Sequence, residues 1–227
     1  DQNIISDCMF WNNNVDDPQS ETTGGGGAVA VAIGGIVNVH SCDFYRNRAE
    51  KGNGGAFSID GNQASINLYN TTMRFNKAIN GGAMYFNRVS KGTLFQTNLW
   101  GNNATDAGGG FHLDGPSLVS MYFCNILDNH AGTDGGGGYL GGSRSSLSIK
   151  GSAFLRNLAP YGYGGGLCAT HTKKPIINED VNLTEYNGLY ERCFEVEASY
   201  FSRNEAGQGG SVFWKFTAFD DISIFVP

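Results

Sequence analysis

The feature that most constrains this chain is a short motif that recurs along its length, and residues 42–57, CDFYRNRAEKGNGGAF, hold one copy. An aromatic or aliphatic residue is followed three positions later by Asn and five positions later by a small apolar residue. The first position is occupied by Phe10, Phe44, Met73, Leu99, Ile126, Phe154 and Phe201. The Asn position is occupied by Asn13, Asn47, Asn76, Asn102, Asn129, Asn157 and Asn204. Such self-similarity indicates a repeat architecture.

The spacing of the motif predicts strands. Successive copies are 34, 29, 26, 27, 28 and 47 residues apart, and apolar and polar residues alternate within each period. Each period holds three strand-like pieces, exemplified by GGAFSID at 54–60, SINLY at 65–69 and the motif itself. One such unit cannot bury its own apolar face, so neighbouring units must stack. The sequence therefore predicts an all-β parallel β-helix, a solenoid of about seven rungs with three short strands each.

The recurring Asn and Gly positions fit the corners of such a stack. Stacked Asn side chains at a turn can hydrogen-bond up and down a ladder, and the glycine pair supplies positive φ or close backbone approach. The two longer spacings indicate insertions at 14–23 and 171–192. We expect residues 1–227 to form a single domain that is a segment of a longer solenoid.

The motif resembles a known repeat. Phe44 to Asn47, followed by Gly54-Gly55-Ala56, is similar to the repeat of chlamydial polymorphic membrane proteins and to the pectin-lyase-like group of right-handed parallel β-helices. The resemblance covers nearly the whole chain and implies a right-handed coil. That group includes adhesins, structural surface proteins and polysaccharide lyases or hydrolases, so the resemblance leaves the function open.

Charge and composition limit the partners. The net charge is −6, which gives no electrostatic reason to expect nucleic acid or an anionic membrane. The most apolar run, residues 27–37, is too short to span a bilayer. Five cysteines and three glycosylation sequons favour a secreted or cell-surface glycoprotein. The sequons begin at Asn70, Asn103 and Asn182, and all three are expected to be exposed.

One group of residues suggests chemistry. Aligning the glycine pairs places Ser58, Tyr85, His112 and Cys168 in one outward column, and Asp60, Asn87 and Asp114 in the next. Tyr85, His112 and Asp114 would then meet on adjacent rungs, as in an acid–base cluster of a lyase or hydrolase. A solvated polar face is the simpler interpretation, and we favour it.

Two other sets of residues have a structural and a functional interpretation. Asp106 and Asp134 precede glycine runs, where Asx-turn capping is favoured over a shared calcium ion, so we expect no cofactor. Cys168 and Cys193 flank the larger insertion, and a disulfide between them would close a loop of about 25 residues. We expect Cys8, Cys42 and Cys124 to be buried free thiols.

The larger insertion is a candidate binding loop, because loops that interrupt a repeat often carry function. Its candidate contact residues for a partner or a sugar are Lys173, Lys174, Tyr186, Tyr190 and Arg192. A solvated, glycosylated loop is an equal alternative. The sequence as a whole favours a non-enzymatic structural or adhesive surface protein, a rigid rod that assembles end to end with itself or with other surface proteins. The alternatives are a polysaccharide lyase or hydrolase and a carbohydrate-binding module.

Overall fold

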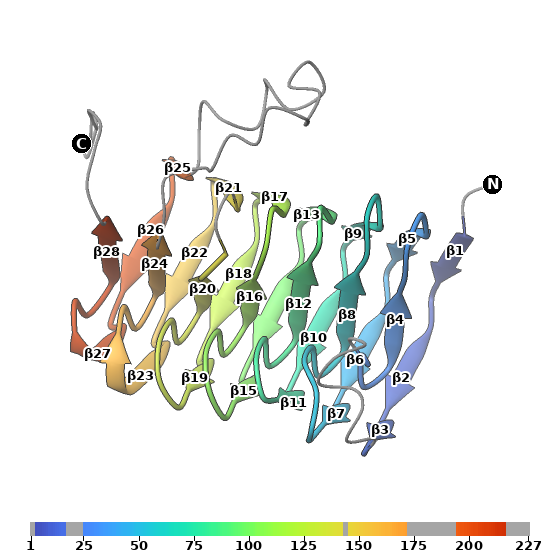
Figure 1. The fold of residues 1–227 in the computed structure, drawn as a ribbon, viewed down its shortest axis with the longest axis horizontal. Coiled ribbons are helices and arrows are strands. Elements are labelled where there is room, and N and C mark those ends of the chain that lie inside the picture. Colours follow the sequence, from blue (N-terminus) through green and yellow to red (C-terminus); the bar gives the residue numbers. More distant parts are fainter. Residues whose placement is uncertain (1–2, 17–24, 143–144, 172–193, 217–227) are drawn as a thin grey trace, which may run out of the picture.

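The chain folds into an elongated stack of short parallel strands (Figure 1). A computed structural model describes residues 3–16, 25–142, 145–171 and 194–216. The strands form four parallel sheets of seven strands each. Neighbouring strands of a sheet are four strands apart in the chain, as β1, β5 and β9 are. The prediction of an all-β parallel solenoid is confirmed, while the right-handed sense stays a prediction.

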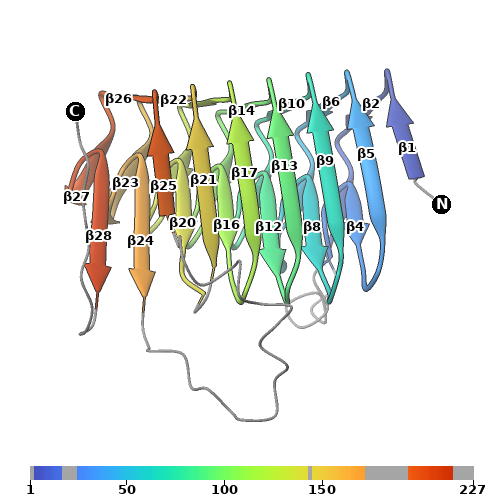
Figure 2. The same cartoon turned by 90° about the horizontal axis from the view of Figure 1, so that it is seen from above.

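The sheets are named A to D in the order in which the chain visits them. Sheet A contains β1 (Asn3–Ser6), β5 (Ile36–His40), β9 (Ser65–Tyr69), β13 (Lys91–Phe95), β17 (Leu118–Tyr122), β21 (Ser146–Lys150) and β25 (Phe194–Glu197), which lie side by side in Figure 2. Sheet B contains β2 (Met9–Trp11), β6 (Asp43–Tyr45), β10 (Thr72–Arg74), β14 (Asn98–Trp100), β18 (Asn125–Leu127), β22 (Ala153–Leu155) and β26 (Tyr200–Ser202).

The other two sheets complete each turn of the coil. Sheet C contains β3 (Asn14–Val15), β7 (Arg48–Ala49), β11 (Lys77–Ala78), β15 (Asn103–Ala104), β19 (His130–Ala131), β23 (Leu158–Tyr163) and β27 (Glu205–Gln208). Sheet D contains β4 (Val29–Val31), β8 (Phe57–Asp60), β12 (Met84–Asn87), β16 (Phe111–Leu113), β20 (Gly138–Leu140), β24 (Leu167–His171) and β28 (Val212–Phe216).

Four strands per turn correct the prediction of three. The extra strand is that of sheet C, which follows the recurring Asn and is only two residues long in most turns, as in Arg48–Ala49. Two residues are too few to show an alternating pattern, so the sequence predicts only a corner at this position. The same error affects the first insertion, because Asn14 and Val15 pair with β7 instead of leaving the sheet. Residues 17–23 and 172–192 of the two insertions lie outside the described residues.

One continuous apolar core runs through the middle of the stack. Residues at equivalent positions of successive turns lie above one another because the parallel strands pair in register, as Phe44 does with Met73 and Met73 with Leu99. These side chains are completely buried. Phe10 stacks on Phe44 with ring centroids 4.6 Å apart and an interplanar angle of 7°. The core is therefore built from columns of apolar residues, which also pack across the coil, as Phe44 does on Phe57 with ring centroids 4.4 Å apart.

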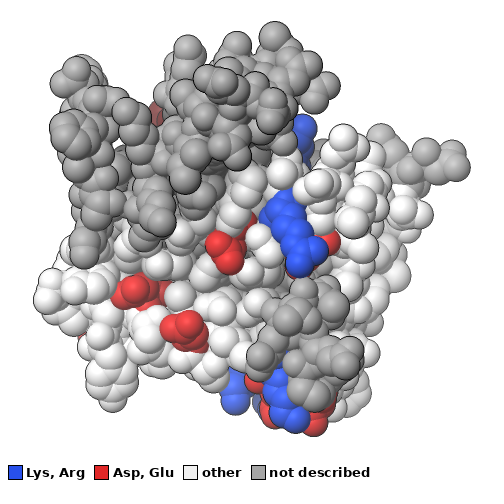
Figure 3. Space-filling view, viewed as in Figure 1, with Lys and Arg blue, Asp and Glu red and all other residues white. Residues whose placement is uncertain are grey.

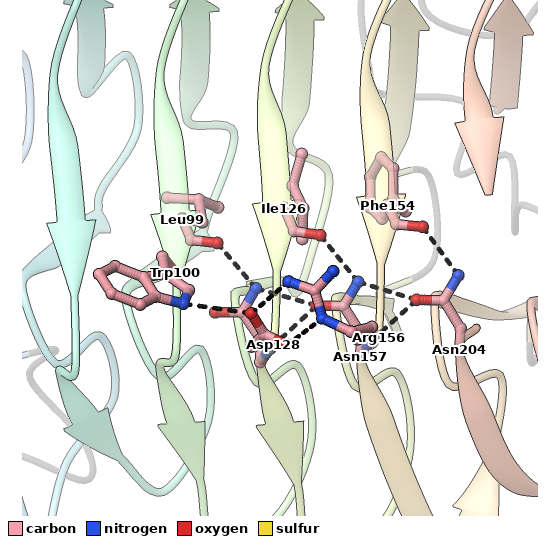
Figure 4. A network of polar contacts seen from close by, with 9 residues as sticks. Leu99, Trp100, Ile126, Asp128, Phe154, Arg156, Asn157 and Asn204 are labelled. Atoms are coloured by element: carbon pink, nitrogen blue, oxygen red, sulfur yellow. Dashed lines mark hydrogen bonds and ion pairs between the residues drawn. The ribbon is translucent and has the colours of Figure 1, made fainter. Parts of the chain in front are cut away.

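The seven recurring Asn residues form a hydrogen-bonded ladder at the corner between sheets B and C. Figure 4 shows the part of it that contains Asn157 and Asn204. Asn102 is representative. Its Nδ2 donates to Oδ1 of Asn129 at 3.0 Å and to the carbonyl oxygen of Met73 at 3.0 Å. Its Oδ1 accepts from both the backbone N and Nδ2 of Asn76. Every polar atom of this fully buried side chain is paired, so the ladder carries no unsatisfied groups.

Glycine at the corner before sheet D allows neighbouring turns to approach closely. At Gly82 an added Cβ would lie closer than 3.0 Å to the backbone of Gly109 and Asn103 in the next turn. Gly81, directly before it, has a φ of 62°. These two requirements explain why a glycine pair recurs immediately before the strands of sheet D.

Candidate binding groove on the outer face of sheet D

The outward side chains of sheet D form one column along the stack. Strand pairing aligns Ser58 with Tyr85, Tyr85 with His112, His112 with Tyr139, and Tyr139 with Cys168. The sequence alignment placed all of these except Tyr139 in the column. Tyr139 was missed because four glycines, 135–138, precede it and make the alignment of the glycine pair ambiguous.

Three aromatic rings of this column make a continuous floor. The ring centroids of Tyr85 and His112 are 5.4 Å apart, and those of His112 and Tyr139 are 4.9 Å apart. Both pairs are tilted, by 48° and 55°, which is a favourable arrangement for aromatic neighbours. Because the rings come from β12, β16 and β20, the floor spans three successive turns.

The structure brings Tyr85 and Asp114 into direct contact. The hydroxyl of Tyr85 donates to Oδ2 of Asp114 at 3.1 Å, and the backbone N of Gly115 donates to Oδ1 at 2.8 Å. Burial and the carboxylate of Asp114 raise the pKa of Tyr85 above its usual value. At neutral pH Tyr85 is therefore a protonated donor that holds this carboxylate at the edge of the floor.

His112 lies in the middle of the floor and is 7 % exposed. Its Nδ1 is buried and has no hydrogen-bond partner among the described residues. Burial lowers the pKa of His112 to about 4, and this outweighs the carboxylates of Asp114 and Asp106 and the backbone of Ala107, which favour the protonated ring. The imidazole is thus neutral at pH 7 and retains unused hydrogen-bonding capacity.

Carboxylates also line the opposite edge of the floor, where the chain turns before sheet D. Asp106 accepts a hydrogen bond from the hydroxyl of Thr133 at 2.8 Å, and Asp134 accepts one from the backbone N of Tyr163 at 2.7 Å. Burial raises the pKa of Asp134, and the neighbouring Asp106 adds to that effect through charge repulsion. Both bonds join neighbouring turns of the stack, so they are not local Asx-turn contacts, and the Asx-turn capping favoured from the sequence stays a prediction.

A cavity of about 320 Å³ lies between these edges, and we call it the acidic pocket. It is lined by Asn80, Asp106, Ala107, His112, Asp114, Thr133, Asp134, Tyr139 and Gly141. No Lys or Arg is among these described lining residues. The nearby Arg88 pairs with Asp60, whose pKa is raised chiefly by burial. On the face of the molecule in Figure 3 some acidic side chains lie in uncharged surroundings, while acidic and basic side chains lie side by side at the lower edge.

A second hollow of about 680 Å³ lies over sheet B and the corner between sheets A and B. It includes Arg74 and Trp100, neither of which the sequence singled out. Arg74 makes a double contact with the carboxylate of Asp43, with its Nη2 2.6 Å from Oδ2. Asp43 neutralises Arg74, and Asp7 is the remaining charged residue of this lining, so this hollow holds fewer uncompensated carboxylates than the acidic pocket.

The remaining predicted site residues are scattered. Asn70 is exposed, whereas Asn103 is half-buried in β15 and its Nδ2 contacts Nδ1 of His130 at 3.2 Å. Asn103 is thus only partly exposed, because it lies within a strand of sheet C, and its glycosylation stays a prediction. Asn182 and the candidate loop residues Lys173, Lys174, Tyr186, Tyr190 and Arg192 lie outside the described residues.

The cysteines occupy several environments. Cys42 and Cys124 are buried free thiols, but Cys8 is exposed, which corrects the expectation for that residue. Cys168 lies in the outward column of sheet D and is nevertheless completely buried. Its predicted disulfide partner Cys193 lies outside the described residues. In the described ranges no group of three or more His, Cys, Asp or Glu residues is arranged to hold a metal ion.

Comparison with known proteins gives no match to a family model, to a characterised protein or to a solved structure. Within the part of the chain that the structure describes, no helix has the length and apolar character needed to cross a bilayer. Function must therefore be argued from the residues themselves.

Proposed function

We propose that this protein is a non-enzymatic structural or adhesive scaffold of the cell exterior. The observation that carries the proposal is the unbroken Asn ladder, which joins successive turns of the stack and leaves none of its buried amide groups unpaired. Such a stack is stiff along its axis, because every turn is bonded in register to both neighbours. A stiff rod suits presentation of surface groups at a fixed spacing.

The finer expectations from the sequence belong to this proposal. They are a right-handed coil of about seven rungs, repeats of the chlamydial polymorphic membrane protein type, and glycans at Asn70, Asn103 and Asn182. The partners are further copies of the chain or other surface proteins, met end to end along the stack. The exposed position of Asn70 supports its glycosylation, since an acceptor amide must be accessible.

The charge of the acidic pocket argues for a non-enzymatic role. A lyase that acts on uronates must neutralise a substrate carboxylate, and the described lining of the pocket offers Asp106, Asp114 and Asp134 without a cationic side chain. Both hydroxyl-bearing rings of the floor, Tyr85 and Tyr139, have raised pKa values that keep them protonated at neutral pH. Neither is poised to act as a base.

A turnover assay combined with a measurement of assembly tests the proposal. The chain would be incubated with neutral and uronate-containing polysaccharides and followed for new reducing ends and for absorbance of unsaturated products. Sedimentation velocity over a range of concentrations would report end-to-end association. We expect no turnover and a concentration-dependent increase in particle length. Turnover that disappears in His112→Ala but persists in Asn98→Ala, a substitution on sheet B, would contradict the scaffold role.

The contact between Tyr85 and Asp114 is the specific observation that favours a second candidate, a polysaccharide lyase or hydrolase. In that case Asp114 and neutral His112 would exchange protons with a sugar bound along the floor, and Tyr85 would orient the carboxylate. Tyr85→Phe would then reduce the rate by about tenfold to a hundredfold, with a smaller change in KM. If Tyr85→Phe leaves all measured turnover unchanged, this candidate fails.

A further inference from the structure

We propose that the acidic pocket is a binding site for a protonated primary amine. The inference names a ligand class for the outer face of sheet D and does not rest on the scaffold role, which is carried by the Asn ladder. The amine is that of an amino sugar in a polysaccharide or that of a free polyamine, and both present the same ammonium group.

The first argument is uncompensated negative charge. Asp106, Asp114 and Asp134 all line the pocket. None of the three forms an ion pair with a Lys or Arg among the described residues. Most other carboxylates among the described residues form an ion pair with a Lys or Arg, as Asp43 does with Arg74 and Asp128 does with Arg156. The pocket thus lacks the cation that the rest of the outer surface supplies from its own side chains.

The second argument is the number of acceptor atoms that remain available. The hydrogen bonds to Asp106 and Asp134 use Oδ1 in each case, and no hydrogen bond from a described residue reaches either Oδ2. An ammonium group carries three donors and no acceptor, so it matches several carboxylate oxygens on neighbouring turns. Repulsion from Asp106 contributes to the raised pKa of Asp134, and a bound cation would relieve that repulsion.

The third argument comes from the floor. His112 is more than nine-tenths buried, lines the pocket and has an Nδ1 without a partner among the described residues. A neutral imidazole can accept a hydrogen bond, and the covered Nδ1 of His112 is a polar atom of the floor whose capacity no described residue uses. The adjacent ring of Tyr139 presents an aromatic face, which also attracts cations. An amine between acidic edges and an aromatic floor therefore gains both kinds of interaction.

A metal ion is the competing occupant for a group of carboxylates. The described residues hold no group of three or more metal-ligating side chains that could bind one. The carboxylates stand on the two opposite edges of an aromatic floor, which suits an organic cation of several ångströms better than a bare ion.

The test is a binding titration of the full chain by calorimetry at pH 7 and low salt. The ligands are a tetramer of β-1,4-linked glucosamine, the same tetramer fully N-acetylated, spermidine and calcium chloride. We expect the glucosamine tetramer to bind at least tenfold more tightly than its acetylated form, because acetylation removes the charge and the donors. Spermidine that binds more tightly than the tetramer would assign the site to free polyamines, and the opposite order would assign it to amino sugars.

Two variants locate the site. Asp106→Asn combined with Asp134→Asn should weaken amine binding at least tenfold. The control Glu50→Gln removes an exposed carboxylate that pairs with Arg48 near sheet C, and it should leave binding unchanged. Circular dichroism of each variant would show that the fold is retained. Equal binding of the acetylated tetramer, unchanged binding by the double variant, or calcium binding that excludes the amines would each overturn the proposal. None of these results would affect the scaffold proposal, whose test is turnover and assembly.

Discussion

Asn102 and Asn129, 27 residues apart in sequence, share a buried hydrogen bond of 3.0 Å between Nδ2 of the first and Oδ1 of the second. Removing one such amide leaves partners on both neighbouring turns unsatisfied. In Asn102→Ala the carbonyl of Met73, the backbone N of Asn76 and Oδ1 of Asn129 would all lose a partner. Each orphaned buried group costs about 1–3 kcal/mol. We expect the free energy of unfolding to fall by about 3 kcal/mol or more, measured by urea denaturation.

A matched control for this experiment is Asn98→Ala. Asn98 also takes part in an Asn–Asn contact, with Asn125 at 2.9 Å, but that contact lies on the exposed outer face of sheet B. Water can replace its hydrogen bonds, so the loss should be below about 1 kcal/mol. Equal losses in the two variants would show that burial of the ladder contributes little to stability.

Because neighbouring turns approach closely at Gly82, we expect a single added methyl group there to lower the stability of the fold strongly. In Gly82→Ala the new Cβ would meet backbone atoms of Gly109 and Asn103, which cannot move without disturbing the next turn. We expect a loss of more than about 3 kcal/mol, or failure to fold. Gly34→Ala is the comparison, because Gly34 has a φ of 70° but nothing within 4 Å of an added Cβ. Its cost, by thermal denaturation, should stay near about 1 kcal/mol.

The burial of His112 predicts a pH dependence of stability. The folded protein keeps this imidazole neutral down to about pH 4, whereas the unfolded chain protonates it near pH 6.5. Between these values the unfolded state binds more protons, so stability falls as the pH is lowered from 6.5 to 4. The interval corresponds to on the order of 3 kcal/mol.

Urea denaturation at several pH values between 4 and 7 measures this contribution. His112→Gln removes the titrating group and should flatten the dependence. Tyr139→Phe preserves the imidazole and a neighbouring ring, and it should keep the wild-type slope. If wild type and His112→Gln lose stability in parallel, groups other than His112 dominate this pH range.

Unequal burial of the thiols predicts selective labelling. Cys8 is exposed, whereas Cys42 and Cys124 are buried. Burial raises the pKa of Cys124 to about 11 and that of Cys168 to about 12, so neither forms appreciable thiolate at neutral pH. Mass spectrometry after brief alkylation at pH 8 should find Cys8 modified well ahead of these three. Labelling after denaturation controls for intrinsic reactivity, and rapid native labelling of Cys124 would contradict the buried core.

The solenoid could be predicted because its stacking leaves a direct trace in the sequence. Each inward column repeats an apolar residue, as with Phe10, Phe44 and Met73, and the spacing of the repeats gives the length of a turn. The two-residue strands of sheet C could not be predicted, since Arg48 and Ala49 are too few to show alternation. Half-burial of Asn103 went unrecognised for the same reason.

The pocket was only partly accessible to sequence reasoning. Alignment of the glycine pairs indicated that Tyr85, His112 and Asp114 would lie near one another, because outward columns follow from the register. The inclusion of Tyr139 depends on a one-residue shift in a run of four glycines, which sequence cannot resolve. That Asp106 and Asp134 line the same pocket depends on how the corner folds over the sheet, which no periodic pattern encodes.

The ladder also bears on the order in which the turns of the stack fold. Successive Asn partners are separated by 26 to 34 residues, except for Asn157 and Asn204, which are 47 apart. Each new turn therefore closes a chain segment of nearly constant length on a template that already exists, and the entropy lost per turn does not grow with the number of turns. Closing 47 residues instead of 27 costs about 0.5 kcal/mol more in the loop-closure approximation. Folding that propagates turn by turn should consequently slow at the step that joins β26 to β22, and unfolding should begin there.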